Sequence, residues 1–228
     1  GEYKNTAREF FATVNLTHNR EWYNRIYEQR IENGQVQRVS LPLSNHGSGY
    51  TVKSTLSKGF YELGLKTSFL VLLNISKAEQ ISGGQRLPYQ YRLMLLEPKV
   101  IWTPNRHWET SYQTDIRYGG NKIGERTRLA PLWNVTQQVQ LSYIFSPIEA
   151  SLSVDHYHND VNEDQSVNAV FADFSVSWKS GRWQITATAT NLFDKRTYAY
   201  TRYASLESYT SWVRIRPREF QVAIRYRL

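Results

Sequence analysis

Hydrophobic and polar residues alternate along most of the chain. The clearest stretch is the C-terminal end, where Phe220, Val222, Ile224 and Tyr226 occupy one phase and Gln, Ala and Arg residues occupy the other. Period two is the repeat of a β-strand, because successive side chains point to opposite faces of a sheet. The pattern therefore predicts a strand with one apolar and one polar side, and no segment of helical length shows a 3.6-residue repeat.

The same alternation recurs upstream and predicts about ten antiparallel strands. Clear segments lie at 61–75, 108–118, 135–145, 150–154, 174–178, 183–190 and 220–228, and weaker ones at 10–18, 50–56 and 89–102. Pro98 interrupts the last of these, and since proline cannot donate to a ladder we expect a bulge there. Strands of roughly 9 to 15 residues are longer than the ~5 to 6 residues usual in soluble sheets, and a tilted strand of this length can cross a bilayer.

The connections alternate in length as well. Short turns are predicted at 58–59, 103–106, 146–147 and 179–182, and long polar connections at 24–49, 78–88, 119–130, 158–166 and 195–211. Aromatic residues gather beside the short turns: Phe60, Tyr61, Trp102, Trp108, Tyr143, Phe145, Trp178, Trp183 and Tyr226. This arrangement is typical of an outer-membrane β-barrel with periplasmic short turns and an interfacial aromatic girdle.

Composition narrows the function classes. The 228 residues include 28 Lys and Arg against 20 Asp and Glu, a net charge of +8, with 14% aromatic residues and no cysteine. The lack of cysteine excludes a disulfide scaffold, a thiolate metal site and a cysteine nucleophile. The longest apolar run, 69–73, is far short of the roughly 20 residues of a membrane-spanning helix. The basic residues are dispersed over alternating strands, so we expect no nucleic-acid partner.

Two other architectures fit the alternation. One is a soluble antiparallel sandwich or small barrel acting as a binding module, and the other is a self-contained small outer-membrane barrel acting as a protease or adhesin. Asp155, His156 and Asp160 are the only plausible nucleus of a rim protease. His156 and His158 share a face but have no third ligand at a suitable spacing, so we expect no metal site. The chain has no phosphate-binding glycine loop, serine nucleophile elbow or metalloprotease helix motif, and we expect neither an enzyme nor a bound cofactor.

Two motifs near the C-terminus carry a resemblance to a known family. The first resembles the N-L-F-D-K segment of TonB-dependent outer-membrane receptors and consists of Asn191, Leu192, Phe193 and Asp194, followed by Lys195. The second is similar to the R-P-R-x-F close of the same family and consists of Arg216, Pro217, Arg218 and Phe220. The sequence is closest in character to receptors of Bacteroidetes. In these the final residue is commonly Phe, whereas Leu228 ends this chain and Tyr226 supplies the aromatic of the assembly signal.

The resemblance implies a fold and a function. In the family a 22-stranded barrel surrounds an N-terminal plug, which bears the box that contacts TonB. Residues 1–228 would then be the C-terminal part of the barrel, without plug or TonB box. The implied function is TonB-dependent uptake of a nutrient such as a glycan, siderophore or peptide across the outer membrane, with this chain supplying barrel wall and extracellular loops. The implied partners are outer-membrane lipid, the plug domain, TonB, the barrel-assembly machinery and a surface lipoprotein.

The last long loop holds the candidate ligand contacts. They form an aromatic and cationic set that can stack on sugars, aromatic groups or a siderophore: Tyr198, Tyr200, Arg202, Tyr203, Tyr209 and Trp212. The alternative role for this set is an outer-leaflet aromatic girdle with packing between loops.

Five arginines are candidates for charge pairing in the lumen. Arg214, Arg216 and Arg218 are expected on one face at two-residue spacing, and Arg225 and Arg227 lie near the periplasmic end. An arginine that faces lipid at mid-bilayer costs ~2 to 4 kcal/mol, so these side chains should point into the lumen or lie beyond the hydrocarbon. We expect them to pair with carboxylates of the plug or neighbouring strands, or with an anionic ligand.

Overall fold

The computed structural model describes residues 1–32, 35–124, 127–128, 131–162, 164–203 and 208–227. The expected all-β, antiparallel fold is confirmed, and the one described element that is not a strand is the short 3-10 turn η1 (Tyr61–Leu63). Among the described residues, no helix is long and apolar enough to cross a membrane. The strands are β1 (Glu2–Asn5), β2 (Phe10–Tyr23), β3 (Ile26–Glu32), β4 (Gln35–Leu41), β5 (Asn45–Phe60), β6 (Leu65–Ser82), β7 (Gln85–Asn105), β8 (Trp108–Ile123), β9 (Thr127–Arg128), β10 (Leu132–Phe145), β11 (Ile148–Asp160), β12 (Ser166–Ser180), β13 (Trp183–Thr190), β14 (Thr197–Tyr203), β15 (Ser208–Arg214) and β16 (Glu219–Tyr226).

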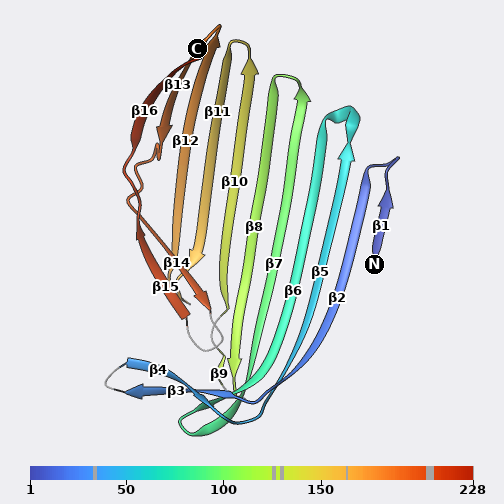
Figure 1. Ribbon diagram of the computed structural model, residues 1–228, viewed down its shortest axis with the longest axis vertical. Helices are drawn as coiled ribbons and strands as arrows, with labels where there is room; N and C mark the ends of the chain where they lie inside the picture. Colours follow the sequence, from blue (N-terminus) through green and yellow to red (C-terminus); the bar gives the residue numbers. More distant parts are fainter. Residues whose placement is uncertain (33–34, 125–126, 129–130, 163, 204–207, 228) are drawn as a thin grey trace.

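The long strands form one sheet in which neighbours in the chain are mostly neighbours in space. Its order is β1-β2-β5-β6-β7-β8-β10-β11-β12-β13-β16, and every ladder along this path is antiparallel. Figure 1 shows these strands side by side, with the tight turns after β1, β5, β7, β10 and β12 gathered at one end and the β3–β4, β6–β7 and β14–β15 hairpins toward the other. Within the described residues β1 and β16 lie at opposite edges and do not pair, so the sheet is open and no closed barrel forms.

The register separates the sheet into two faces. Residues paired across strands point to the same side, so one lateral row defines each face. The apolar face contains the row Leu16, Val52, Leu73, Met94 and Tyr118. The polar face contains the row Ser57, Ser68, Lys99, Gln113, Gln138 and Asp155.

The apolar face is largely exposed. Leu16 is 76% exposed and Phe220 is 73% exposed, and Val222 and Ile224 are also open to the surroundings. The buried apolar side chains of the described residues are few, namely Ile26, Ile81, Leu132, Ala169, Ala172 and Ala199. The large apolar residues of the long strands therefore do not meet in a dry core.

Aromatic residues line the apolar face beside the tight turns, as the sequence predicts. The rings of Trp108 and Tyr143 lie 4.6 Å apart across β8 and β10, and those of Trp183 and Tyr226 lie 4.8 Å apart across β13 and β16. Tyr226 is thus placed at the edge strand. Leu228, the other half of the expected assembly signal, lies outside the described residues.

One predicted turn is displaced and one predicted bulge is wrong. The pair Lys58-Gly59 continues β5, and the reversal occurs at η1, where Gly64 has φ +59° and donates its N–H to the carbonyl of Tyr61. Only glycine fits there, because a Cβ at position 64 would lie 2.0 Å from the Thr103 carbonyl oxygen. Pro98 pairs with Phe69, and the β7–β8 register is the same on both sides of it; the irregularity instead falls between Trp102 and Asn105.

Several of the predicted long loops contain strands. Residues 24–49 hold the β3–β4 hairpin, and 195–211 lie largely within the β14–β15 hairpin. Residues 78–88 continue β6 and β7 up to a tight turn at Gly83 and Gly84. Their polar composition suits strands that have left the apolar band, where both faces meet water or protein.

Candidate functional site

The β14–β15 hairpin lies over the polar face of the main sheet. Ala199 of β14 is fully buried and Thr201 is 1% exposed. The Asn159 side chain of β11 donates to the Tyr198 hydroxyl at 3.0 Å and to the Ala199 carbonyl at 3.4 Å, and the Thr201 hydroxyl donates to the Val161 carbonyl at 3.1 Å. These contacts fix the hairpin against β11 and its connection to β12.

Aromatic rings fill the junction between the hairpin and the sheet. The ring of Tyr198 lies 5.1 Å from Tyr157 and 6.4 Å from Phe171, both in edge-to-face geometry. Tyr200 lies 5.8 Å from Tyr198 on the same side of β14. The two tyrosines therefore point toward the polar face rather than into solvent.

A cavity of about 670 Å³ lies beside this junction. Its wall is built by β7, β8, β10, β11 and β14 and includes Tyr91, Gln113, Asp115, Arg117, Asn134, Gln138, Tyr157, Asn159, Tyr198, Tyr200 and Thr201. Arg117 and Asp115 form a two-bond ion pair at 2.9 and 2.8 Å. The buried Asn134 side-chain oxygen has no hydrogen-bond partner within the described residues, so it is available to a donor on a bound group.

A second cavity of about 530 Å³ adjoins the first. Tyr157 and Tyr198 line both cavities. The second cavity also contains the carboxylates Asp155 and Asp173 together with Arg216. The pair of cavities offers aromatic faces, amides, hydroxyls and both signs of charge, which is a lining suited to holding a polar organic ligand or a packed protein segment.

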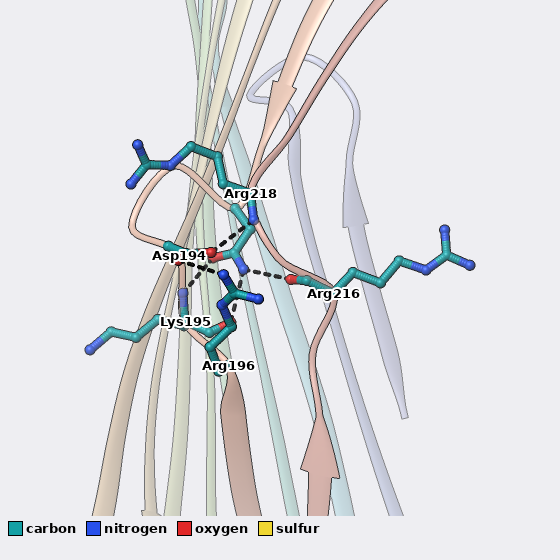
Figure 2. Close-up of polar contacts among 6 residues, drawn as sticks. Asp194, Lys195, Arg196, Arg216 and Arg218 are labelled. Atoms are coloured by element: carbon teal, nitrogen blue, oxygen red, sulfur yellow. Dashed lines mark hydrogen bonds and ion pairs between the residues drawn. The ribbon is translucent and has the colours of Figure 1, made fainter.

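Asn191, the first residue of the N-L-F-D motif, holds the base of the hairpin. It is 7% exposed and adopts φ +50°, a conformation that asparagine tolerates better than most residues. Its side-chain amide donates to the carbonyls of Lys195 and Arg216, both at 2.8 Å, and its side-chain oxygen accepts from the Lys195 N–H at 3.0 Å. One side chain thereby joins the chain entering β14 to the chain leaving β15, and Figure 2 labels Lys195 and Arg216, the two residues that it connects.

Asp194 completes this connection. Its carboxylate accepts the Arg218 backbone N–H at 2.9 Å and the Arg196 guanidinium at 2.9 Å (Figure 2). The Arg218 N–H and then the Arg196 guanidinium lower the pKa of Asp194 below its ordinary value, because both stabilise the charged form. We call Asn191, Asp194 and the backbone of Lys195, Arg216 and Arg218 the clasp.

The remaining motif residues have simpler positions. The Leu192 N–H donates to the Ala172 carbonyl at 2.8 Å, which continues the contact with β12. Phe193 and Phe220 are exposed, and Phe220 lies on the apolar face of β16. Pro217 stands between the two clasp arginines, in a stretch with no regular structure.

Only part of the expected ligand-contact set comes together. Tyr198 and Tyr200 line the first cavity, whereas Tyr209 and Trp212 of β15 are exposed, Trp212 by 64%. The backbone of Arg202 and Tyr203 belongs to β14, but their side chains lie outside the described residues.

One part of the arginine prediction is wrong, namely the shared face of Arg216 and Arg218, while charge pairing with plug or ligand groups stays a prediction. Figure 2 shows the side chains of Arg216 and Arg218 pointing away from each other, so these two do not share a face. The physical reason is that the chain leaves the strand after Arg214 and passes through Pro217 before β16 begins. Arg225 pairs with Gln184 on the polar face, and the Arg227 N–H donates to the Arg182 carbonyl. None of the five forms an ion pair within the described part of the chain.

The proposed protease nucleus is divided between two faces. Asp155 lies on the polar face, while His156 and Asp160 lie on the opposite face, as the strand alternation requires. His156 contacts the Gln137 side chain at 3.0 Å, and Asp160 accepts the Trp133 N–H at 2.8 Å. The described residues contain no group of three or more His, Cys, Asp or Glu side chains able to hold a metal ion.

Sequence reasoning missed the residues that the sheet contributes to the cavities. Tyr91, Asp115, Arg117 and Asn159 occupy polar-face positions of three different strands. Their phase in the alternation was readable, but only the register and the position of the hairpin bring them together.

No protein-family model, curated protein or solved structure matches the chain.

Proposed function

We propose that the chain forms the C-terminal part of the wall of a TonB-dependent receptor barrel in the outer membrane of a Gram-negative bacterium. In this role it supplies barrel wall, lumen surface and extracellular hairpins for the uptake of a nutrient such as a glycan, siderophore or peptide. The observation that carries the proposal is the continuous exposed apolar face of the main sheet. The two C-terminal motifs support the choice of family.

The apolar face has the dimensions of a bilayer core. On β6 the apolar-face residues run from Leu65 to Ile75, interrupted only by Thr67, and Lys77 follows. Ten steps of about 3.3 Å span about 33 Å along the strand, and a tilt of about 40° reduces this to about 25 Å across a membrane. Aromatic side chains close the band beside the tight turns, where interfacial rings are favoured.

The open edges support a larger barrel over a self-contained one. β16 pairs with β13 on one side, and its other edge carries free backbone donors and acceptors among the described residues. A sheet edge of this kind is stable in lipid only when another strand pairs with it. Further strands of the same receptor would satisfy it, and the polar face would then look onto the plug.

The clasp and the β14–β15 hairpin fit the ligand-facing side of such a wall. The hairpin emerges from the end opposite to the tight turns, which is the extracellular end in this orientation. It turns inward over the polar face, where the tyrosine-lined cavities lie. Tyr198 and Tyr200 are therefore the residues we assign to ligand or plug contact.

Single cysteines test the proposal cleanly because the chain has none of its own. In lipid vesicles, cysteines replacing Val139 and Leu141 of β10 should resist a charged maleimide, while those replacing Gln140 and Ser142 should react. An environment-sensitive fluorophore should report lipid at the first pair and water at the second. Equal labelling of both pairs would overturn the proposal, and monomeric solubility without detergent would favour a soluble module.

A further inference from the structure

Three lateral rows cross the apolar face from β2 to β8 at the end away from the tight turns. The first, here called the apolar row, is Leu16, Val52, Leu73, Met94 and Tyr118. The next, the boundary row, is His18, Tyr50, Ile75, Arg92 and Gly120. The outermost, the cation row, is Arg20, Ser48, Lys77, Gln90 and Lys122.

The rows change character over a short distance. Each row lies two residues beyond the last, a step of about 7 Å along the strands. In the boundary row the His18 ring stacks on Tyr50 with centroids 4.3 Å apart, an amphipathic pair of the kind found at membrane interfaces. The cation row therefore lies at the depth of lipid headgroups if the apolar band spans the hydrocarbon, and this step rests on the proposed function.

The cations are regularly spaced and uncompensated. Arg20, Lys77 and Lys122 alternate with the neutral residues of their row, and strands about 4.8 Å apart place them at intervals of about 10 Å. Arg92 lies diagonally next to Lys77. Within the described residues none of these four forms an ion pair, and the neighbouring carboxylate on β6, Glu79, is already held by Arg86 at 3.1 Å.

The apolar face of the other half of the sheet has a different composition at this end. Tyr118 of the apolar row pairs with Trp133 on β10, and β10 begins one residue before it. The apolar-face positions at the end of β11 and the start of β12 are His156, His158, Asp160 and Asn168, which lie at or before this level. His158 contacts Asn168 at 2.9 Å and lies 3.4 Å from Asp160. In β10, β11, β12, β13 and β16 no apolar-face position is a lysine or arginine, so the cation row is a feature of the strands from β2 to β8.

We propose that the cation row and Arg92 bind the phosphate groups of membrane lipid headgroups. Lysine and arginine donate charge-assisted hydrogen bonds to phosphate oxygens, and their long side chains reach from the strand backbone to headgroup level. Lipids with an exposed anionic phosphate gain from these contacts, whereas zwitterionic headgroups gain little. The row selects such lipids for the annulus around this part of the wall.

The test measures lipid preference at the row itself. A fluorophore attached through Ser48→Cys sits in the middle of the cation row, and lipids with brominated acyl chains quench it on contact. Quenching by brominated phosphatidic acid, relative to brominated phosphatidylcholine, gives the relative association constant. We expect clear preference for phosphatidic acid, and a loss of about fivefold for each cation removed.

The chain offers a matched control for the variant. Lys77→Gln, Arg92→Gln and Lys122→Gln remove three cations from the apolar face and should abolish most of the preference. Lys53→Gln, Lys66→Gln and Lys99→Gln remove three cations from the polar face of β5, β6 and β7 and should leave it unchanged. Free inorganic phosphate in the buffer should not displace the lipid.

Each contrary result has a distinct meaning. If both triple variants lose the preference equally, net charge explains it and the row is not a site. If neither loses it, the inference is also wrong, although the wall proposal stands. If brominated phosphatidylcholine fails to quench the label in any variant, this face does not meet lipid, and the proposed function falls together with the inference.

Discussion

The apolar face and the polar face are made by the same strands, yet different kinds of contact hold them. The apolar face repeats along every long strand and depends on no single side chain. Within one row, for example, Leu16, Val52 and Leu73 are neighbours on successive strands. Over β8 to β12 the polar face is covered by a hairpin that a few particular groups hold in place, above all Asn191 and Asn159. A repeated apolar pattern tolerates substitution by similar residues, whereas the clasp loses its hydrogen bonds when a single side chain such as Asn191 is removed.

The largest expected effect concerns a charge on the apolar face. Leu141→Arg places a guanidinium in the middle of the β10 band and should lower the free energy of unfolding in lipid vesicles by ~2 to 4 kcal/mol. Gln140→Arg, one residue away on the polar face, should change it by less than about 1 kcal/mol. Denaturant titration of both variants gives the values, and similar losses for the two would remove the distinction between the faces.

Loss of the Asn191 side chain should be the next largest effect. Asn191→Ala removes three hydrogen bonds of the clasp and leaves alanine at a positive φ, which together cost about 3 kcal/mol. Hydrogen exchange of β14 and β15 amides should rise while that of β10 and β11 stays low. Asn191→Gly also removes the hydrogen bonds but adopts a positive φ without strain, so its loss of stability measures the hydrogen bonds alone. If Asn191→Ala were as stable as the parent chain, the clasp would not contribute to stability.

A smaller effect on stability is expected from removing one tyrosine hydroxyl, and its size should differ between the polar and the apolar face. Tyr198→Phe leaves the Asn159 amide without its closest acceptor and should destabilise the hairpin by about 1 kcal/mol. Tyr118→Phe, on the apolar face against Trp133, keeps the ring contact at 4.6 Å and should change the stability by a few tenths of a kcal/mol at most. Exchange rates of the β14 amides distinguish the two, and equal rates would contradict the assigned contact.

The smallest expected effect is a pH dependence at Asp194. Its pKa is lowered in the folded chain, so its contribution to stability is complete above its unfolded pKa of about 3.9 and is lost as the pH falls through the lower folded value. The stability difference between the parent chain and Asp194→Asn should therefore be constant above about pH 5 and vanish in stronger acid. A difference that persists unchanged into stronger acid would assign the effect to shape rather than charge.

The apolar face was readable from the sequence because its rule is local. Period-two alternation located β13 at Trp183–Thr190 with its observed bounds, and it located the aromatics beside the turn at Gly181. The same rule failed for β3, β4, β14 and β15, whose apolar and aromatic residues do not keep to one phase of the period-two alternation. Composition alone cannot separate such strands from loops.

The cavities were not readable because their members are distant in the sequence. Tyr91, Asp115 and Tyr198 meet only through the register of four strands and the inward turn of one hairpin. The prediction of a shared face for Arg216 and Arg218 failed for a related reason, since two-residue spacing means a shared face only inside a strand. Pro217 and the clasp take residues 215–218 out of the ladder, and the spacing then loses its meaning.

The extension of β6 and β7 beyond the boundary row gives the sheet an uneven height. From Ile75 to Ser82, β6 continues for seven residues, or about 23 Å along the strand, before the turn at Gly83 and Gly84. On β12 the strand starts at Ser166, opposite Asp160, and this position is level with Tyr118 of the apolar row. If the sheet is part of a barrel, the β6–β7 hairpin would project further from the membrane than the strands near β12. A bulky solute or protein would then approach over the shorter strands, where the tyrosines of β14 lie.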